Sequence, residues 1–308
     1  MSRSQGAGRR RWFVVWLLAT LLVILTPLAI AGFWVRAVVL DADRYVATVA
    51  PLADDPALQA AVADQVSAQV VEAVDNSGVR DLAVGPLEGL LDNVLEGLET
   101  RVREQTTRVV ASDAFAEAWA GANRASHDDV VAALTGDGTD VSVRGEAFVE
   151  AARAGLTAAG FGALADLVPD IEATFVVYSS DGLPSVQRGV RLLSAVGGWI
   201  WAVALAVGVV VVVVAPRRSL GLAAAAGAIA LGALMLAAGL TLARAGYVGD
   251  PDEALSPAAR AAVFDQVTLL LRSALVWTIV VAALALALGV LLRLLSGTPA
   301  PSTADQSP

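Results

Sequence analysis

The sequence has no cysteine, no lysine and a single histidine, His127. Without cysteine the chain can form no disulfide and carry out no thiolate chemistry. A zinc site is also disfavoured, because neither a cysteine nor a second histidine is available as a ligand. All 21 basic residues are arginine. Together with abundant alanine, valine and glycine, this composition is typical of a GC-rich bacterial genome.

Charge is missing from four long stretches, although 17% of the chain is charged. A helix of about 20 apolar residues crosses the ~30 Å hydrocarbon core of a bilayer. The pattern therefore predicts a mainly α protein with four transmembrane helices and a helix-rich extracytoplasmic domain between the first two. The uncharged windows are Trp12–Val35, Leu192–Ala215, Leu220–Ala243 and Ser273–Leu292.

Ionisable residues within spans mark ion paths and proton relays. The four windows contain none, and none has a broken centre, since Pro27 lies near the outer end of the first. A stand-alone pump or secondary transporter is therefore disfavoured.

Arginine clusters set the predicted orientation, because short cytoplasmic loops are enriched in basic residues. Arg9–Arg11, Arg217–Arg218 and Arg293 fall on one side if every window spans once. We therefore expect a multi-pass protein of the bacterial plasma membrane with both termini cytoplasmic.

The expected organisation is a basic N-terminus 1–11, spans 12–35, 192–215, 220–243 and 273–292, an extracytoplasmic domain 36–191, a cytoplasmic loop 216–219, an extracytoplasmic loop 244–272 with a helix start, and a disordered cytoplasmic tail 293–308.

A cleavable signal peptide is the alternative for the first span, because Ala29-Ile30-Ala31 resembles a cleavage site. The apolar run continues through Trp34 and Val35, which favours an uncleaved anchor. Both interpretations place 36–191 outside the cytoplasm.

The domain 36–191 holds 11 arginines and 25 acidic residues, a net charge of −14. This charge disfavours nucleic-acid binding, which needs a basic surface.

Asp55 with Pro56, and Ser112, are predicted helix caps. Further expected elements are an amphipathic helix over Leu87–Val102, strands at Val141–Val143 and Thr174–Tyr178, a helix near 146–159, a segment Val186–Ser194 leading straight into the second span, and a helix from Ser256-Pro257 through Arg272 into the fourth span.

Trp119, Asn123 and His127 are spaced i, i+4, i+8 and would share one face of a helix. One interpretation is a small polar pocket or a pH-sensitive contact, because imidazole titrates near physiological pH. The alternative is a histidine satisfied by hydrogen bonds within a helical core. We keep the three residues as the candidate ligand-binding or pH-sensitive face.

Paired carboxylates occur at Asp54-Asp55 and Asp128-Asp129. Neither pair has the loop spacing of a calcium hand. The sequence has no nucleophile elbow, glycine-rich phosphate loop or metalloprotease motif. We therefore predict no catalytic residue, no cofactor and no metal ligand.

The segment Asp41–Gln59, which includes Val-Ala-Pro-Leu-Ala-Asp-Asp-Pro at 49–56, resembles a family of actinobacterial integral membrane proteins of unknown function. The Trp119–His127 stretch and the later spans are also similar. The resemblance implies a topology and a source, and it transfers no catalytic residue.

The leading hypothesis is a non-enzymatic integral membrane protein whose extracytoplasmic domain binds an envelope partner or ligand, as a scaffold or sensor. Its expected partners are the lipid bilayer and a protein or envelope component, with no nucleic acid. The alternative is an accessory subunit of a transport or export complex, and an envelope-acting enzyme is the third hypothesis.

Overall fold

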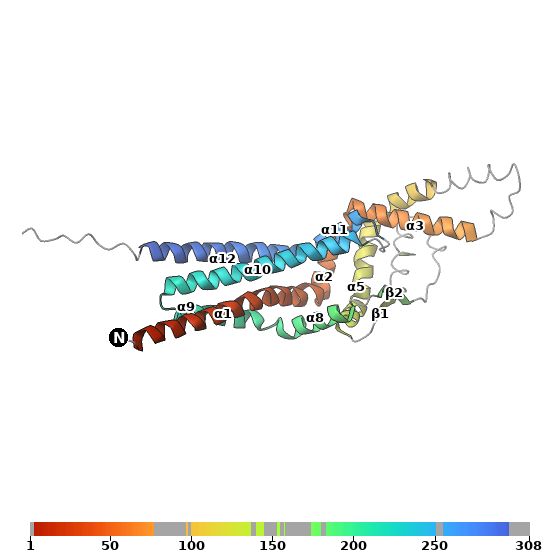
Figure 1. Ribbon diagram of the computed structural model, residues 1–308. Coiled ribbons are helices and arrows are strands. Elements are labelled where there is room, and N and C mark those ends of the chain that lie inside the picture. The colour runs from red at the N-terminus through yellow and green to blue at the C-terminus, as the bar shows by residue number, and fades with distance from the viewer. Residues whose placement is uncertain are drawn as a thin grey trace, which may run out of the picture. The chain divides into compact units, whose positions relative to one another are not determined.

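In a computed structural model, the chain is described for residues 3–76, 97, 100–136, 140–144, 153–154, 157, 174–179, 183–250 and 255–295. The predicted mainly α fold is confirmed (Figure 1). Most of the expected helix at 87–102, most of the helix near 146–159 and the tail beyond 295 lie outside these residues. The elements are helices α1 (Arg3–Trp34), α2 (Ala42–Val49), α3 (Pro56–Asn76), α5 (Asp113–Thr135), α8 (Leu183–Val196), α9 (Ile200–Val214), α10 (Arg218–Gly249), α11 (Pro257–Val267) and α12 (Leu269–Leu295), the π-helix η1 (Val35–Val39), the 3-10 helix η2 (Ala50–Asp54), and strands β1 (Asp140–Arg144) and β2 (Thr174–Ser179).

The chain divides into two compact units. We call Met1–Arg36, Leu192–Leu242 and Leu270–Pro308 the apolar unit. The polar unit consists of Ala37–Arg191 and Ala243–Leu269.

Three helical segments are long and apolar enough to cross a membrane: Arg9–Val39, Arg218–Gly249 and Leu269–Leu295. A fourth crossing is possible if the pair Pro184–Val196 and Ile200–Val214, bent by 66°, counts as one span. The protein is therefore a multi-pass membrane protein, and its apolar surface lies in a lipid bilayer.

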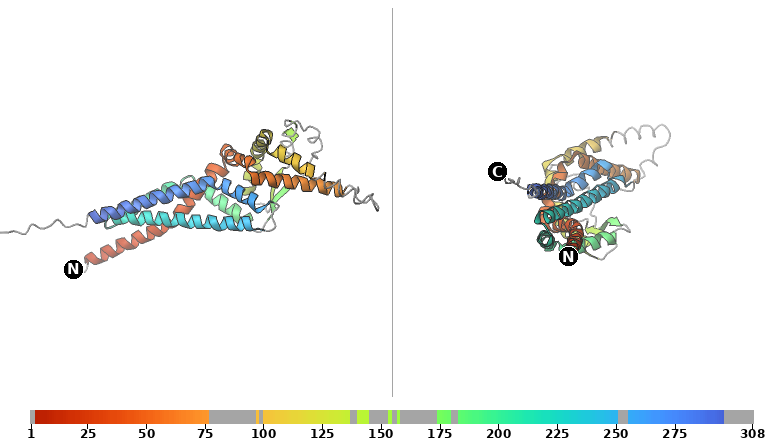
Figure 2. Two further views of the ribbon diagram at one scale, coloured as in Figure 1. Left: turned by 90° about the horizontal axis from the view of Figure 1, so that it is seen from above. Right: turned by 60° about the vertical axis from the view of Figure 1, so that its left-hand side comes forward.

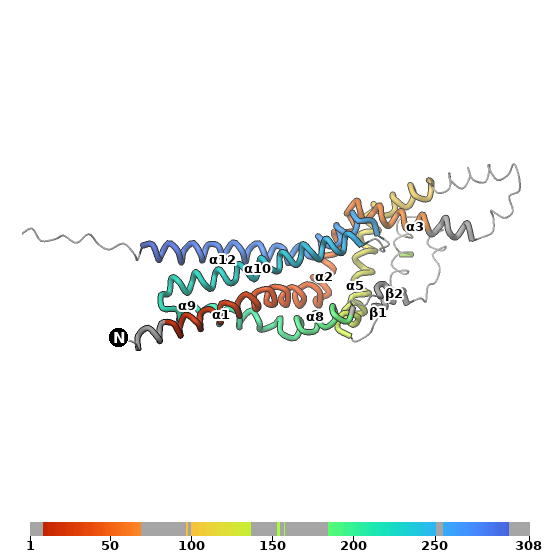
Figure 3. The backbone as a smooth tube through the Cα atoms, in the orientation of Figure 1, coloured from red at the N-terminus to blue at the C-terminus, as the bar shows by residue number. Residues whose placement is uncertain are grey.

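The apolar unit is built on α1, which packs along α9 (Figure 2). The N-terminal end of α1, the turn from α9 to α10 and the C-terminal end of α12 lie at the same end of this unit (Figure 3). Its buried core consists of Val15, Leu22, Val211, Ala215, Ala225 and Ala228.

Helix α12 is buried along one narrow seam of Leu271, Leu275, Ala282 and Gly289. The last three are seven residues apart, the period of coiled-coil packing. At Gly289 an added Cβ would lie 3.0 Å from the carbonyl oxygen of Ser219 on α10. The absence of a side chain at Gly289 thus lets the two helices approach closely, as is common between membrane helices.

Helix α10 approaches α1 closely at Gly232. Pro27 has no N–H, so the carbonyl of Val23 lacks its usual partner within α1. A Cβ on Gly232 would lie 2.7 Å from that carbonyl oxygen and 3.2 Å from Cδ of Pro27. In the glycine a hydrogen points in this direction instead and can form a weak C–H···O contact with the carbonyl.

Two predicted continuous helices are interrupted. The expectation that Val186–Ser194 leads straight into the second span is wrong, because α8 ends at Val196 and α9 begins at Ile200 after the 66° bend. The helix expected to run from Ser256 through Arg272 is divided, because α11 ends at Val267 and α12 begins at Leu269. The first break could not be read from the apolar pattern, which is continuous through residues 192–215.

Two predicted helix caps and the two expected strands of the polar unit are confirmed. Asp55 Oδ1 accepts the N–H groups of Ala57 and Leu58 at 2.8 and 3.2 Å, which caps α3. The hydroxyl of Ser256 accepts the N–H of Ala259 at 3.2 Å and caps α11. The expected strands are present and pair antiparallel as β1 and β2. The core of this unit joins α2, η2 and α3 with Trp119 and α11, through Val49, Leu52, Leu58, Tyr45, Val62, Ala262, Val263 and Val267.

Candidate functional site

Helix α5 carries all three residues of the candidate face. It begins where the hydroxyl of Ser112 accepts the N–H of Phe115 at 3.3 Å, as the sequence predicts. Asn123 and His127 are buried, at 7% and 4% exposure, while Trp119 is half-buried. The structure therefore directs this face inward.

Trp119 and Asn123 use their polar groups inside the polar unit. The indole Nε1–H of Trp119 donates to the carbonyl of Val49, at the end of α2, over 2.9 Å. Asn123 Nδ2 donates to the carbonyl of Trp119 at 2.9 Å, and its Oδ1 lies 3.4 Å from the donating hydroxyl of Tyr45. Burial raises the pKa of the Tyr45 hydroxyl above its usual value, because the phenolate would lose hydration.

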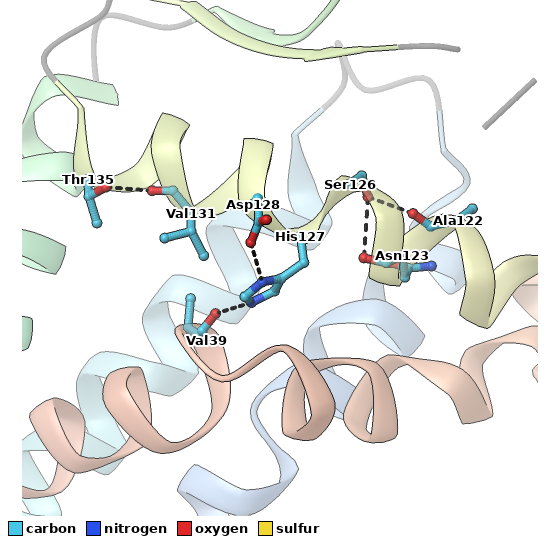
Figure 4. Close-up of polar contacts among 8 residues, drawn as sticks. All are labelled: Val39, Ala122, Asn123, Ser126, His127, Asp128, Val131 and Thr135. Carbon is cyan, nitrogen blue, oxygen red and sulfur yellow. Dashed lines mark hydrogen bonds and ion pairs between the residues drawn. The ribbon is translucent and has the colours of Figure 1, made fainter. Parts of the chain in front are cut away.

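His127 reaches the π-helix that continues α1. Its Nε2 lies 3.0 Å from the carbonyl oxygen of Val39 (Figure 4). A carbonyl can only accept, so Nε2 carries the hydrogen and the neutral ring has its lone pair on Nδ1. Within the described part of the chain Nδ1 has no hydrogen-bond partner, and Asp128 Oδ1 is 3.7 Å away. The ring also lies 5.2 Å, between centroids, from the ring of Tyr45.

The three residues thus fasten α5 onto two short segments, η1 and α2. The contacts match the alternative of a histidine bonded within a helical core, and each candidate side chain has a polar atom engaged inside the protein. Tyr45, Val39 and Val49, which receive α5, were missed. The available signal was weak: Tyr45 and Val49 are spaced i, i+4 after the capping residue Asp41, whose Oδ1 accepts the N–H of Arg44 at 2.9 Å.

The paired carboxylates differ in role. Asp55 caps α3, whereas Asp54 and Asp128 are exposed. Among the described residues, no group of three or more histidine, aspartate or glutamate side chains could hold a metal ion.

A second polar cluster connects α10 and α11, and sequence reasoning missed it. Arg244 donates from Nε and Nη2 to the two carboxylate oxygens of Asp265, each over 2.8 Å. The buried Arg260 donates to the carbonyls of Tyr247 and Asp250, at the end of α10. Opposite charges on either side of a short loop, as at Arg244 and Asp265, are the signal that could have found this cluster.

Gln266 extends this cluster toward α2, because its Nε2 donates to the carbonyl of Thr48 at 2.9 Å. Segments 218 residues apart in sequence are therefore joined inside the polar unit. The carbonyls of Thr48 and Val49 are thus used by α11 and α5 respectively, which makes the end of α2 the common attachment point.

No protein-family model, no curated protein and no solved structure matches this chain.

Proposed function

We propose that this chain is a non-enzymatic envelope protein, anchored in the plasma membrane of an actinobacterium, whose extracytoplasmic domain binds a protein or envelope component and holds or reports it at the membrane. The observation that carries the proposal is the inward attachment of α5. Trp119 and His127 donate to the carbonyls of Val49 and Val39. These carbonyls belong to the segments that follow α1 directly in the chain, so the domain's helices are fastened to the continuation of a span.

This attachment favours a mechanical role over a chemical one. A catalytic group must reach a substrate, whereas the buried imidazole and the indole N–H are both directed at backbone carbonyls. An arrangement of this kind supports a rigid domain that holds a bound partner.

Orientation is part of the proposal. The N-terminal end of α1, the turn from α9 to α10 and the C-terminal end of α12 lie at one end of the apolar unit (Figure 1). In sequence, Arg9–Arg11, Arg217–Arg218 and Arg293 belong to these segments. Basic residues favour the cytoplasmic side, so we place both termini in the cytoplasm. The packing of α1 along α9 supports an uncleaved anchor, because removal of α1 would take Val15 and Leu22 out of the core and expose its other members, such as Val211 and Ala215.

The second candidate is an accessory subunit of a transport or export complex. Helix α12 favours it, because this helix is buried along one seam and exposes most of its other apolar side chains, including Trp277 and Leu284. Such a surface suits either lipid or the helices of a partner.

Site-specific photocrosslinking separates the two candidates. A photoreactive residue would replace exposed Gln65 on α3 or Glu117 on α5 for the domain, and Trp277 or Leu284 on α12 for the spans. The full-length protein would be crosslinked in cells, transferred to lipid nanodiscs and examined by mass spectrometry. The proposed function predicts one recurrent adduct from the domain positions, and the accessory-subunit candidate predicts protein adducts from α12. Lipid adducts alone at all four positions would contradict both.

A further inference from the structure

Arg36 follows α1 and packs against the break between α8 and α9. Its Nη1 donates to the carbonyl of Ser194, in the last turn of α8, over 3.0 Å. A Cβ built on Gly198 would lie 3.6–3.8 Å from the guanidinium atoms, so the guanidinium lies over this glycine. All of these residues belong to the apolar unit.

Among the described residues, Arg36 uses only a small part of its hydrogen-bonding capacity. A guanidinium has five N–H donors, and the bond to Ser194 takes one of them. Within the described part of the chain, Arg36 makes no other hydrogen bond and pairs with no carboxylate, and its side chain is exposed. The positive charge therefore lacks a partner from these residues.

Helix lengths place the break at or within the boundary of the bilayer, and the 24 uncharged residues Trp12–Val35, about 36 Å as a helix, place Arg36 just beyond the hydrocarbon core. The 15 residues of α9 extend about 22 Å, which is less than the ~30 Å of a typical hydrocarbon core. If α9 crosses the membrane, the break that precedes α9 therefore cannot lie outside the bilayer. Direct contact between Gly32 and Gly197 sets the break level with the end of α1.

Exposed aromatic side chains lie close in sequence to the break between α8 and α9 and to the end of α1. Trp199 and Trp201 are 57% and 55% exposed, and Phe33 is similarly exposed. Indole rings favour the membrane–water boundary, where an apolar ring and a polar N–H are both accommodated. Lipid phosphates lie at the same depth, within reach of an arginine that leaves the span.

We propose that Arg36, flanked by Trp199 and Trp201, binds the phosphate of an anionic phospholipid of the outer leaflet, such as phosphatidylglycerol. A guanidinium matches phosphate with paired N–H···O bonds. A headgroup of net negative charge also supplies the counter-charge that the described residues do not. This site is independent of whatever the extracytoplasmic domain binds.

The test uses delipidated full-length protein, equimolar phosphatidylglycerol and phosphatidylcholine, and native mass spectrometry. We expect wild type to retain one phosphatidylglycerol more than Arg36→Gln does, with an affinity about tenfold higher. Arg188→Gln is the matched control, because Arg188 is an exposed arginine on α8 that bonds within its own helix. Equal retention by wild type and Arg36→Gln, or equal loss in both variants, would overturn the proposal.

A second measurement needs no variant and covers the case in which Arg36→Gln unfolds. Nanodiscs would contain headgroup spin-labelled phosphatidylglycerol or phosphatidylcholine at equal mole fraction, and tryptophan quenching would be recorded. We expect stronger quenching by the labelled phosphatidylglycerol, and no relief on addition of inorganic phosphate. Equal quenching by both lipids argues against a site, and relief by inorganic phosphate would show that a free anion is the ligand.

Discussion

Gly32 of α1 and Gly197 of the α8–α9 break are in direct backbone contact. A Cβ on Gly32 would lie 2.9 Å from Cα of Gly197, and one on Gly197 would lie 2.6 Å from the carbonyl oxygen of Leu193. Real Cβ atoms do not come so close, so both positions require the absence of a side chain. The bend that separates α8 from α9 is therefore tied to the end of α1.

Gly197→Ala should lower the thermal stability of the protein, because the methyl group would collide with backbone atoms that cannot rotate away. The expected loss is about 1–3 kcal/mol, measured as thermal unfolding of the purified protein in nanodiscs. Gly208→Ala in α9 is the control, since a Cβ there meets nothing within 4 Å. It should be neutral or stabilising by up to about 1 kcal/mol. Equal effects at both positions would refute the close contact.

Gly232→Ala should separate α10 from α1. The added methyl would meet the Val23 carbonyl and Thr26, and we expect a loss of about 1–3 kcal/mol. The matched control on α10 is Gly227→Ala, where the Cβ enters open space. Disulfide trapping between cysteines introduced along α1 and α10 would report the spacing, and an unchanged trapping rate in Gly232→Ala would count against the contact.

Trp119→Phe should weaken the attachment of α5 to α2. The change keeps an aromatic ring but removes the N–H that donates to Val49, at a cost of about 1 kcal/mol. Hydrogen exchange over α5 and α2 should accelerate, while exchange in α12 stays unchanged. Trp277→Phe is the control, because this indole is 67% exposed in the apolar unit. If both variants change exchange to the same degree, the bond to Val49 does not stabilise the attachment.

Because the hydroxyl of Tyr45 is buried, the folded protein should lose stability in alkali. Its folded-state pKa is raised above the ordinary value of 10.0 by burial, so the native state holds the proton more tightly than the unfolded state does. The resulting stability is complete below the unfolded-state pKa and is lost as the pH rises through the folded-state pKa. Thermal unfolding from pH 8 to 11 should show a steeper decline for wild type than for Tyr45→Phe. Parallel curves would mean that Tyr45 ionises as freely in the folded protein as in the unfolded chain.

The candidate face could be predicted only in part. Helical spacing put Trp119, Asn123 and His127 on one side of α5, because the period of a helix is a local property. The partners of these residues lie 70 and 88 positions earlier, at Val49 and Val39. No local pattern connects such distant carbonyls to an indole or an imidazole.

The sequence by itself determined the features that depend on neighbouring residues. Uncharged apolar stretches established the membrane class, since transfer of a helix into lipid depends on its own side chains. Asp55, Ser112 and Ser256 determined where three helices begin, because a cap bonds to N–H groups two or three residues away.

Only the tertiary structure decided the contacts between segments far apart in the chain. Gly32 contacts Gly197 at the bend before α9, and Arg244 of α10 pairs with Asp265 of α11. The hydrophobic pattern runs unbroken through residues 192–215, because side chains that face lipid are apolar whether or not the helix bends. Close backbone packing and paired charges are decided by three-dimensional proximity, which this pattern does not encode.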